Sequence, residues 1–487
     1  MEPGVAQAAV DWHALAPELV LTAAACIVLV ADLFLPGEAK WVAMPLSAAG
    51  IFATLAAVVS LIGVDRGTLD GAFIVNDFAL FLKGLFCILG LLVLAISYHY
   101  FRSGRYYQGE YYFLMLSSLL GGLVMASARD LVSIFIAIEL ISVPGFVMAA
   151  LRKGDPKSNE GALKFFLFGV LSSAVMLYGM SLVYGMTGQT RLHLIRESIG
   201  AGGDESLIVL AVFFIVVGFA FKVSAVPFHF WAPDTYEGAP SPVAAFLSTA
   251  SKIGGFVGLL VLLFVAFPGV SDTWRPIMAV LAATTMTVGN LIALRQRHMI
   301  RLLAYSGIAQ SGYILVAFAL IDPAGGARND QAFQSALVYI AIYGIMDLGA
   351  FAAAVAFARR GSYFIDDYSG LWQRSPALAA LLAAFLISLA GVPPMAGAWA
   401  KLFVFLAAIN SEVYWLAVVM GVNAVIAAWY YLAVVKRMFF ERPEAQEAIE
   451  VPYLLKAAMG AAVLELFAVF VYPQMLTRLA ERAVLGS

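Results

Sequence analysis

The sequence predicts an all-α, polytopic membrane protein with about fourteen transmembrane helices. Its 487 residues are 62% hydrophobic and only 12% charged, with a mean hydropathy of +0.91, whereas roughly 25% of the residues in a soluble domain are charged. Apolar stretches of about 18 to 25 residues, long enough to cross about 30 Å of hydrocarbon as a helix, recur along the chain. The first of them is expected to remain as a span, because no basic segment and cleavage site accompany it.

The expected spans follow one another with short connections, so no separate soluble domain is expected. They lie near residues 16–36, 41–63, 76–99, 111–128, 130–151, 161–187, 206–226, 241–266, 276–294, 300–321, 332–358, 376–411, 413–438 and 454–477.

Two of these spans are interrupted by proline, which removes a backbone donor and clashes with the preceding turn. The run at 376–411 is too long for one simple span and contains Pro393-Pro394, which predicts a single discontinuous helix. The other interruption is Pro227, just after Lys222. Interrupted spans in corresponding places indicate a transporter built from repeats.

The two interruptions divide the chain into corresponding units. If spans 4 to 8 and 9 to 13 are two five-helix repeats, each break falls in the fourth helix of its unit. An odd number of helices puts the second copy in the opposite topology, so the repeats are expected to be inverted. The predicted division is an N-terminal three-helix segment at 1–110, a first repeat at 111–270, a second repeat at 271–440 and a C-terminal helix at 441–487.

Basic side chains predict the orientation in the membrane. Loops after the odd-numbered spans hold 16 of the 29 lysines and arginines, whereas loops after the even-numbered spans and the C-terminus hold 8. Because short cytoplasmic loops are rich in lysine and arginine, both termini are expected on the non-cytoplasmic side. The remaining basic residues lie inside predicted spans, and all of them are lysines: Lys83, Lys164, Lys222, Lys252 and Lys401.

Lysines inside spans indicate proton transfer. Arginine stays protonated in essentially any environment, whereas desolvation can lower a lysine pKa by about 3 to 5 units from about 10.4. A nearby carboxylate acts in the opposite direction, so opening or closing an ion pair would load or unload the amine. Glu139, in the middle of its span, is the expected partner of Lys222.

The buried charges are not equally strong candidates. Inserting a charge into a span costs about 2.5 to 3.5 kcal/mol, which favours a functional role for Glu139, Lys222 and Lys401. Lys164 and Lys252 lie near small residues, as expected for helix faces inside a bundle.

Other ionisable residues have a competing structural interpretation. Lys83 is near the start of its span and is expected to snorkel to the headgroups. Asp347 is a candidate relay because its span is central. Asp32 and Glu465 fit contacts between helices or subunits as well as they fit a proton path.

Two histidines are candidates to gate proton entry. His229 follows the first break in an expected short polar helix, and His298 lies at the expected cytoplasmic edge. A charged interface residue is an equally good interpretation of His298.

The sequence offers no site for a redox cofactor, a metal or nucleic acid. Cys26 and Cys87 are too far apart for a C-x-x-C motif, and no G-x-G-x-x-G opens a helix. A net charge of −2 without a basic patch argues against nucleic acid. Any redox chemistry is therefore expected in another chain.

Three segments resemble the antiporter-like subunits of respiratory complex I, the proton-pumping NADH:quinone oxidoreductase. They are FKVSAVPFHFWAPDTYEGAPSPVAAFLSTASK at 221–252, RLLAYSGIAQSGY at 301–313 and GVPPMAGAWAKLFVF at 391–405. The PDTYEGAP form and Lys401 after the Pro-Pro break resemble the N-type subunit. One departure is Gln310, where many members of the family carry histidine.

The resemblance implies roles for individual residues. It makes Glu139 and Lys222 the coupling pair, Lys252 with Lys164 a relay along the midplane, and Lys401 the terminal site of the second half-channel. It also implies neighbouring membrane subunits and a peripheral arm with NADH, FMN, iron–sulfur clusters and quinone, in a bacterial inner membrane rather than a mitochondrial one.

Three functions remain open on the sequence. The first is a pump subunit driven by redox chemistry in its partners, without catalysis of its own. The second is a subunit of a multi-subunit cation/proton antiporter, and the third is a scaffold whose buried charges only hold subunits together.

Overall fold

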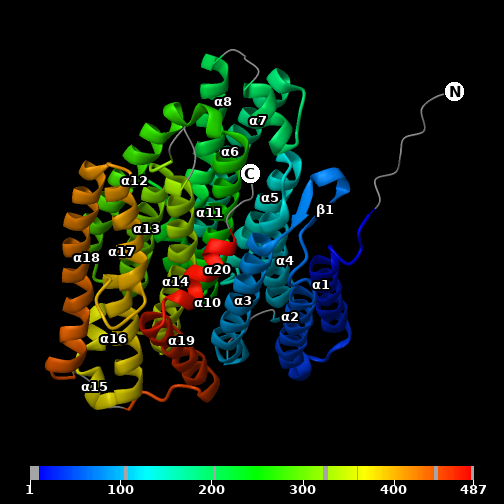
Figure 1. Cartoon of the computed structure of the whole chain (residues 1–487). Helices are drawn as coiled ribbons and strands as arrows, with labels where there is room; N and C mark the ends of the chain where they lie inside the picture. Colours follow the sequence, from blue (N-terminus) through cyan, green and yellow to red (C-terminus); the bar gives the residue numbers. More distant parts are fainter. Residues whose placement is uncertain are drawn as a thin grey trace.

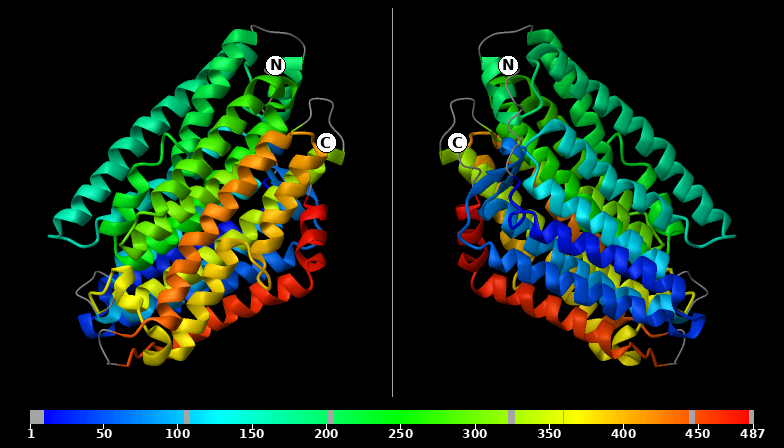
Figure 2. Two further views of the ribbon diagram at one scale, coloured as in Figure 1. Left: turned by 90° about the vertical axis from the view of Figure 1, so that its left-hand side faces the viewer. Right: turned by 90° about the vertical axis from the view of Figure 1, so that its right-hand side faces the viewer.

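The computed structural model describes residues 10–103, 108–200, 205–321, 327–358, 360–443 and 448–483. Its helices form one oblique bundle, with α1 and α2 at one edge and α18 at the opposite edge (Figures 1 and 2). Twelve helices in the described part of the chain are long and apolar enough to cross a membrane. Three shorter apolar helices, at 206–222, 376–390 and 397–410, accompany them.

The N-terminal segment contains four long helices and a small hairpin. They are α1 (Ala16–Phe34), α2 (Ala43–Ser60), β1 (Arg66–Thr68), β2 (Phe73–Val75), α3 (Asp77–Ser103) and α4 (Gln108–Ser127). The two strands are antiparallel, with Gly67 opposite Ile74.

The next segment contains the first break. It comprises α5 (Leu131–Ala149), α6 (Pro156–Thr187), α7 (Leu192–Gly200), α8 (Glu205–Lys222), α9 (Trp231–Gly238), α10 (Ser241–Phe246) and α11 (Lys252–Val261). Asp130 caps α5 by accepting from the backbone of Val132 and Ser133, and Asp155 caps α6, which begins with a proline. A π-helical turn at Leu247–Ser251 joins α10 to α11.

The following segment contains the second break. It comprises α12 (Ser271–Ala293), α13 (Met299–Phe318), α14 (Ala327–Ala358), α15 (Leu371–Arg374), α16 (Pro376–Ala390), α17 (Gly397–Asn410) and α18 (Tyr414–Phe440). The chain continues with α19 (Tyr453–Val471) and the short amphipathic α20 (Gln474–Arg482).

Both predicted interruptions are present. The helix expected at 206–226 ends at Lys222, and nonhelical residues lead to α9. The run at 376–411 is divided into α16 and α17, because Gly391 takes a left-handed conformation with φ +81° and ends α16. His229 lies in the turn before α9 rather than in the short helix expected there.

The long helix α14 lies inside the bundle (Figure 1), and its apolar stretch after the exposed first turn is buried. In contrast, α1, α6 and α18 leave much of their surface exposed, as expected of helices that face lipid or other subunits.

Close contacts around the second break depend on glycine. A Cβ added at Gly397 would lie 1.8 Å from the carbonyl oxygen of Ser388, so α16 and α17 approach here at the backbone.

We predict that Gly397→Ala destabilises the protein by about 1 to 3 kcal/mol, because the backbone of α16 or α17 must shift to admit the methyl group. Gly421→Ala on α18 is the matched control, since a Cβ there meets nothing within 4 Å. The Tm of the purified protein should fall for Gly397→Ala and stay unchanged or rise for Gly421→Ala. Equal Tm values would contradict this account of the second break.

Candidate functional site

Lys222 is the last residue of α8 and is buried at the first break, with 3% of its surface exposed. Its Nζ donates to the hydroxyl of Ser142 on α5 at 2.9 Å. That hydroxyl in turn donates to the carbonyl of Ile138 at 2.7 Å. The amine therefore has a polar partner, but this partner carries no charge.

Glu139 lies one turn before Ser142 on α5 and does not form the expected ion pair with Lys222. Its Oε1 instead accepts a hydrogen bond from Ser173 of α6 at 2.5 Å. Lys222 binds Ser142, which lies on the same helix, α5, as Glu139. The amine and the carboxylate are therefore both positioned by α5. The predicted coupling of Glu139 with Lys222 stays a prediction: the two side chains form no ion pair in this conformation, and the carboxylate still acts electrostatically on the amine.

Lys252 opens α11 directly after the π-helical turn and is 1% exposed. Its Nζ donates to the carbonyl of Gly307 on α13 at 3.2 Å. A Cβ at Gly307 would lie 3.3 Å from this nitrogen and 3.2 Å from the hydroxyl of Tyr343. The glycine therefore leaves room for an amine and a phenol to face the same small space.

Asp347 belongs to this buried group. It is fully buried on α14, and Tyr343 one turn earlier donates to its Oδ2 at 3.3 Å as well as to the carbonyl of Ser248 at 2.7 Å. The other oxygen, Oδ1, has no hydrogen-bond partner among the described residues. The candidate relay at Asp347 thus shares Tyr343 with the surroundings of Lys252.

Lys401 lies on α17 beyond the second break and is 7% exposed. Its Nζ donates to the carbonyl of Ala390 at 2.8 Å and lies 4.7 Å from the centre of the Tyr313 ring. Ala390 is the last residue of α16. Its carbonyl is available to the amine because no further helical turn follows to occupy it.

Gln310 lies in a polar group beside the second break. Its amide donates to the carbonyl of Leu389 at 2.9 Å and accepts from the hydroxyl of Tyr339 at 2.6 Å. The amide also donates to Tyr431 at 3.3 Å, whose hydroxyl lies 2.5 Å from that of Ser306. Sequence reasoning missed these tyrosines, because tyrosine in an apolar span carries no signal of its own.

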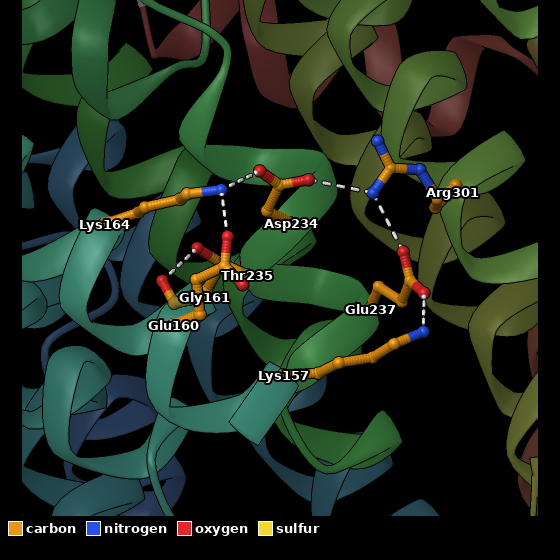
Figure 3. Close-up of polar contacts among 8 residues, drawn as sticks. All are labelled: Lys157, Glu160, Gly161, Lys164, Asp234, Thr235, Glu237 and Arg301. Carbon is orange, nitrogen blue, oxygen red and sulfur yellow. Dashed lines mark hydrogen bonds and ion pairs between the residues drawn. The ribbon is translucent and has the colours of Figure 1, made fainter. Parts of the chain in front are cut away.

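Lys164 lies in a partly exposed ion-pair network and does not share the contacts of Lys252. It is in the early part of α6, its side chain is 38% exposed, and it pairs with Glu160 at 2.6 Å and Asp234 at 2.7 Å. The same network contains Arg301, whose Nη1 lies 2.8 Å from both Asp234 and Glu237 (Figure 3). The relay through Lys164 and Lys252 stays a prediction, since the two lysines have different contacts here.

This ion-pair network joins α6, α9 and α13 near one end of the bundle and is completed by Lys157, 2.9 Å from Glu237 (Figure 3). Burial alone would raise the pKa of Asp234, but hydrogen bonds from Lys164 and Arg301 outweigh it and hold that pKa below its usual value. The network therefore stays ionised at neutral pH.

Both candidate histidines are partly buried next to helix starts. Burial lowers the pKa of His229 and of His298, although the nearby charge of Glu237 opposes the effect at His298. The Nδ1 atoms of both rings have no hydrogen-bond partner among the described residues.

Lys83 was expected to snorkel, and this prediction is wrong. Its side chain is completely buried and pairs with Glu18 of α1 at 2.7 Å. The strand residue Phe73 covers the pair, with its ring centre 4.9 Å from Nζ. The hairpin lies over the start of α3, so the lysine has no route to the headgroups.

Asp32, near the end of α1, forms an ion pair with Lys40 at 2.9 Å.

Comparisons with known proteins agree with this architecture. The model of the NADH:quinone oxidoreductase/Mrp antiporter transmembrane family matches residues 128–427. NADH-quinone oxidoreductase subunit N of Moorella thermoacetica is 38% identical over 472 residues, which cover 96% of this chain and 98% of that protein. Subunit N of Desulfitobacterium hafniense is 37% identical over 480 residues, which cover 96% of this chain and 97% of that protein.

Solved structures give the same result. A chain of respiratory complex I from Thermus thermophilus is 30% identical, superposes with a TM-score of 0.80, and is matched over 96% of this chain and 99% of its own length. A chain of the Mrp complex from Dietzia shares the fold, with a TM-score of 0.84 at 20% identity over 97% of each chain. The present chain belongs to the NADH:quinone oxidoreductase/Mrp antiporter transmembrane family and, within it, to the N-type antiporter-like subunits of NADH-quinone oxidoreductase.

Proposed function

We propose that this subunit moves protons across the bacterial inner membrane through Lys222, Lys252 and Lys401, driven by redox chemistry in other subunits. One observation carries the proposal. The three lysines are buried, each donates to an uncharged oxygen, and none lies within 4.0 Å of a carboxylate among the described residues. A buried amine that has no carboxylate within ion-pair distance can exchange its proton more readily than one held in a permanent ion pair.

Glu139 and Asp347 supply the opposing charge in this proposal. A rotation of Glu139 from Ser173 towards Lys222 would favour the protonated amine, and its return would favour release. Asp347, with its unpartnered oxygen, would do the same for Lys252 through Tyr343. In this proposal protons enter through the partly exposed network around Lys164, beside which His298 lies, and through His229 in the turn before α9.

The membrane topology is part of the proposal. Counting α8 as one crossing, and α16 with α17 as one broken crossing, brings the twelve long helices to fourteen. This count supports inverted five-helix repeats at 111–270 and 271–440, between the segments at 1–110 and 441–487, and both termini on the non-cytoplasmic side. The two breaks, each with a buried lysine, support the repeat.

The proposal places NADH, FMN, iron–sulfur clusters and quinone in partner subunits. Relatives named as subunits of an oxidoreductase support this division of labour. The chain would then perform no redox reaction alone, and the neighbouring antiporter-like subunits would extend its charged axis.

We predict that Lys222→Met leaves the complex assembled but lowers NADH-driven proton transfer by at least about tenfold, because the variant keeps an unbranched side chain of similar length and loses the ionisable group. The measurement is the rate at which membrane vesicles that contain the whole complex take up protons when NADH is added. Lys436→Met is the control, since Lys436 is exposed at the end of α18. Full pumping by the Lys222 variant would favour the scaffold function instead.

Tyr343 and Asp347 test the buried relay. Asp347→Asn should slow proton transfer several-fold, and Tyr343→Phe less, because the phenylalanine loses only the hydroxyl between Ser248 and Asp347. If Asp347 acts through Lys252, Asp347→Asn should add no further slowing to Lys252→Met. If the double variant slowed proton transfer by the product of the two single effects, the shared relay would be contradicted.

The second candidate is a cation/proton antiporter, favoured by the fold shared with the Mrp complex. Liposomes that contain the purified chain alone distinguish the two functions. We expect no sodium- or potassium-dependent proton flux above that of empty liposomes, because the driving reaction is absent. Robust ion-dependent flux without partner subunits would establish the antiporter function and contradict our proposal.

A further inference from the structure

The helix α19 lies along the outside of the bundle (Figure 2). One of its faces contacts the segment at the second break, and the opposite face is exposed. Its inward face is buried and consists of Leu455, Met459, Ala462, Leu466 and Val469. Residues between these positions are exposed, including Leu464 at 70% and Phe467 at 45%.

Glu465 lies on the exposed face. It is twelve residues after Tyr453 and six before Val471, which places it roughly 18 Å and 9 Å from the two ends of the helix axis. A glutamate side chain is too short to bring its carboxylate to the headgroups from that depth. No basic group among the described residues lies within ion-pair distance of it. A carboxylate in contact with lipid at this position would remain without a partner.

The surface around Glu465 allows another helix to approach closely. Ala461 and Ala468 lie one turn before and one turn after it on the exposed side, with Ala457 a further turn away. A Cβ added at neighbouring Gly460 would meet nothing within 4 Å. Small residues on one face of a membrane helix permit close backbone contact with another helix.

The same stretch of α19 holds the segment that precedes Lys401. The carbonyl of Leu466, next to Glu465, accepts a hydrogen bond from the backbone nitrogen of Ala396 at 3.2 Å. Trp399 donates through Nε1 to the carbonyl of Phe470 at 3.0 Å. Two hydrogen bonds therefore link α19, on the side away from its exposed face, to the segment at the second break.

We propose that the face of α19 formed by Ala457, Ala461, Leu464, Glu465 and Ala468 docks a transmembrane helix of another subunit, which presents a lysine or arginine to Glu465. A basic group satisfies both the charge and the hydrogen-bonding capacity of the carboxylate in hydrocarbon, which lipid chains do not. The inference rests on membership of a multi-subunit complex. It does not depend on the proposed proton path, because no residue of that path lies on α19.

A photo-crosslinking amino acid at position 464, in the whole complex in native membranes, tests the docking. We expect one other membrane subunit to become attached to this chain. The same amino acid in place of buried Met459 is the control and should attach only within this chain. Attachment of position 464 to lipid alone would overturn the proposal.

Charge variants then test the role of the carboxylate. Glu465→Lys should reduce the yield of the crosslinked product by about tenfold, because two cations would meet without water. Glu465→Gln should keep part of the yield, since its carbonyl still accepts a hydrogen bond. An unchanged yield with Glu465→Lys would overturn the proposed basic partner. Normal crosslinking with defective pumping in Lys222→Met would show that the two proposals stand separately.

Discussion

Each buried amine in this bundle has to reach an oxygen, because hydrocarbon offers no water to solvate it. Each of the three lysines meets this requirement in a different way. Lys401 reaches the carbonyl that the end of α16 releases, and Lys252 reaches a carbonyl of α13 that a glycine leaves accessible. Lys222, at the very end of α8, uses the hydroxyl of Ser142 instead. The carbonyl that serves Lys401 is free because the helix ends there, since the last carbonyls of a helix have no partner within it.

The choice of neutral partners is central to the mechanism. An ion pair with a permanent neighbour would hold the proton on the amine, whereas a carbonyl or hydroxyl stabilises it only moderately. The contrast lies within the same molecule, where Lys83 is completely buried and paired with Glu18 at 2.7 Å. Such a pair resists a change of charge. Neutralising either Lys83 or Glu18 would leave the other side chain as an uncompensated buried charge. Lys83 therefore suits a fixed joint between α1 and α3.

The sequence predicted the helical architecture, both breaks and the three lysines that the structure buries without an ion-pair contact. Length, hydropathy and proline position carry that information because they act locally along the chain. Contacts between distant segments were not predictable in the same way. Lys164 and Lys83 both lie several residues inside a helix, yet one is half-exposed in a network with Asp234 and the other is sealed by the hairpin. Only the packing of α9 and β2 distinguishes them.

The central claim is that Lys222, Lys252 and Lys401 carry protons through this subunit. The most direct measurement is the number of protons moved per NADH oxidised by the reconstituted complex when all three are replaced by methionine. The account predicts a lower ratio than in the unmodified complex, at an unchanged rate of NADH oxidation by an artificial acceptor. The same ratio in both complexes would contradict it.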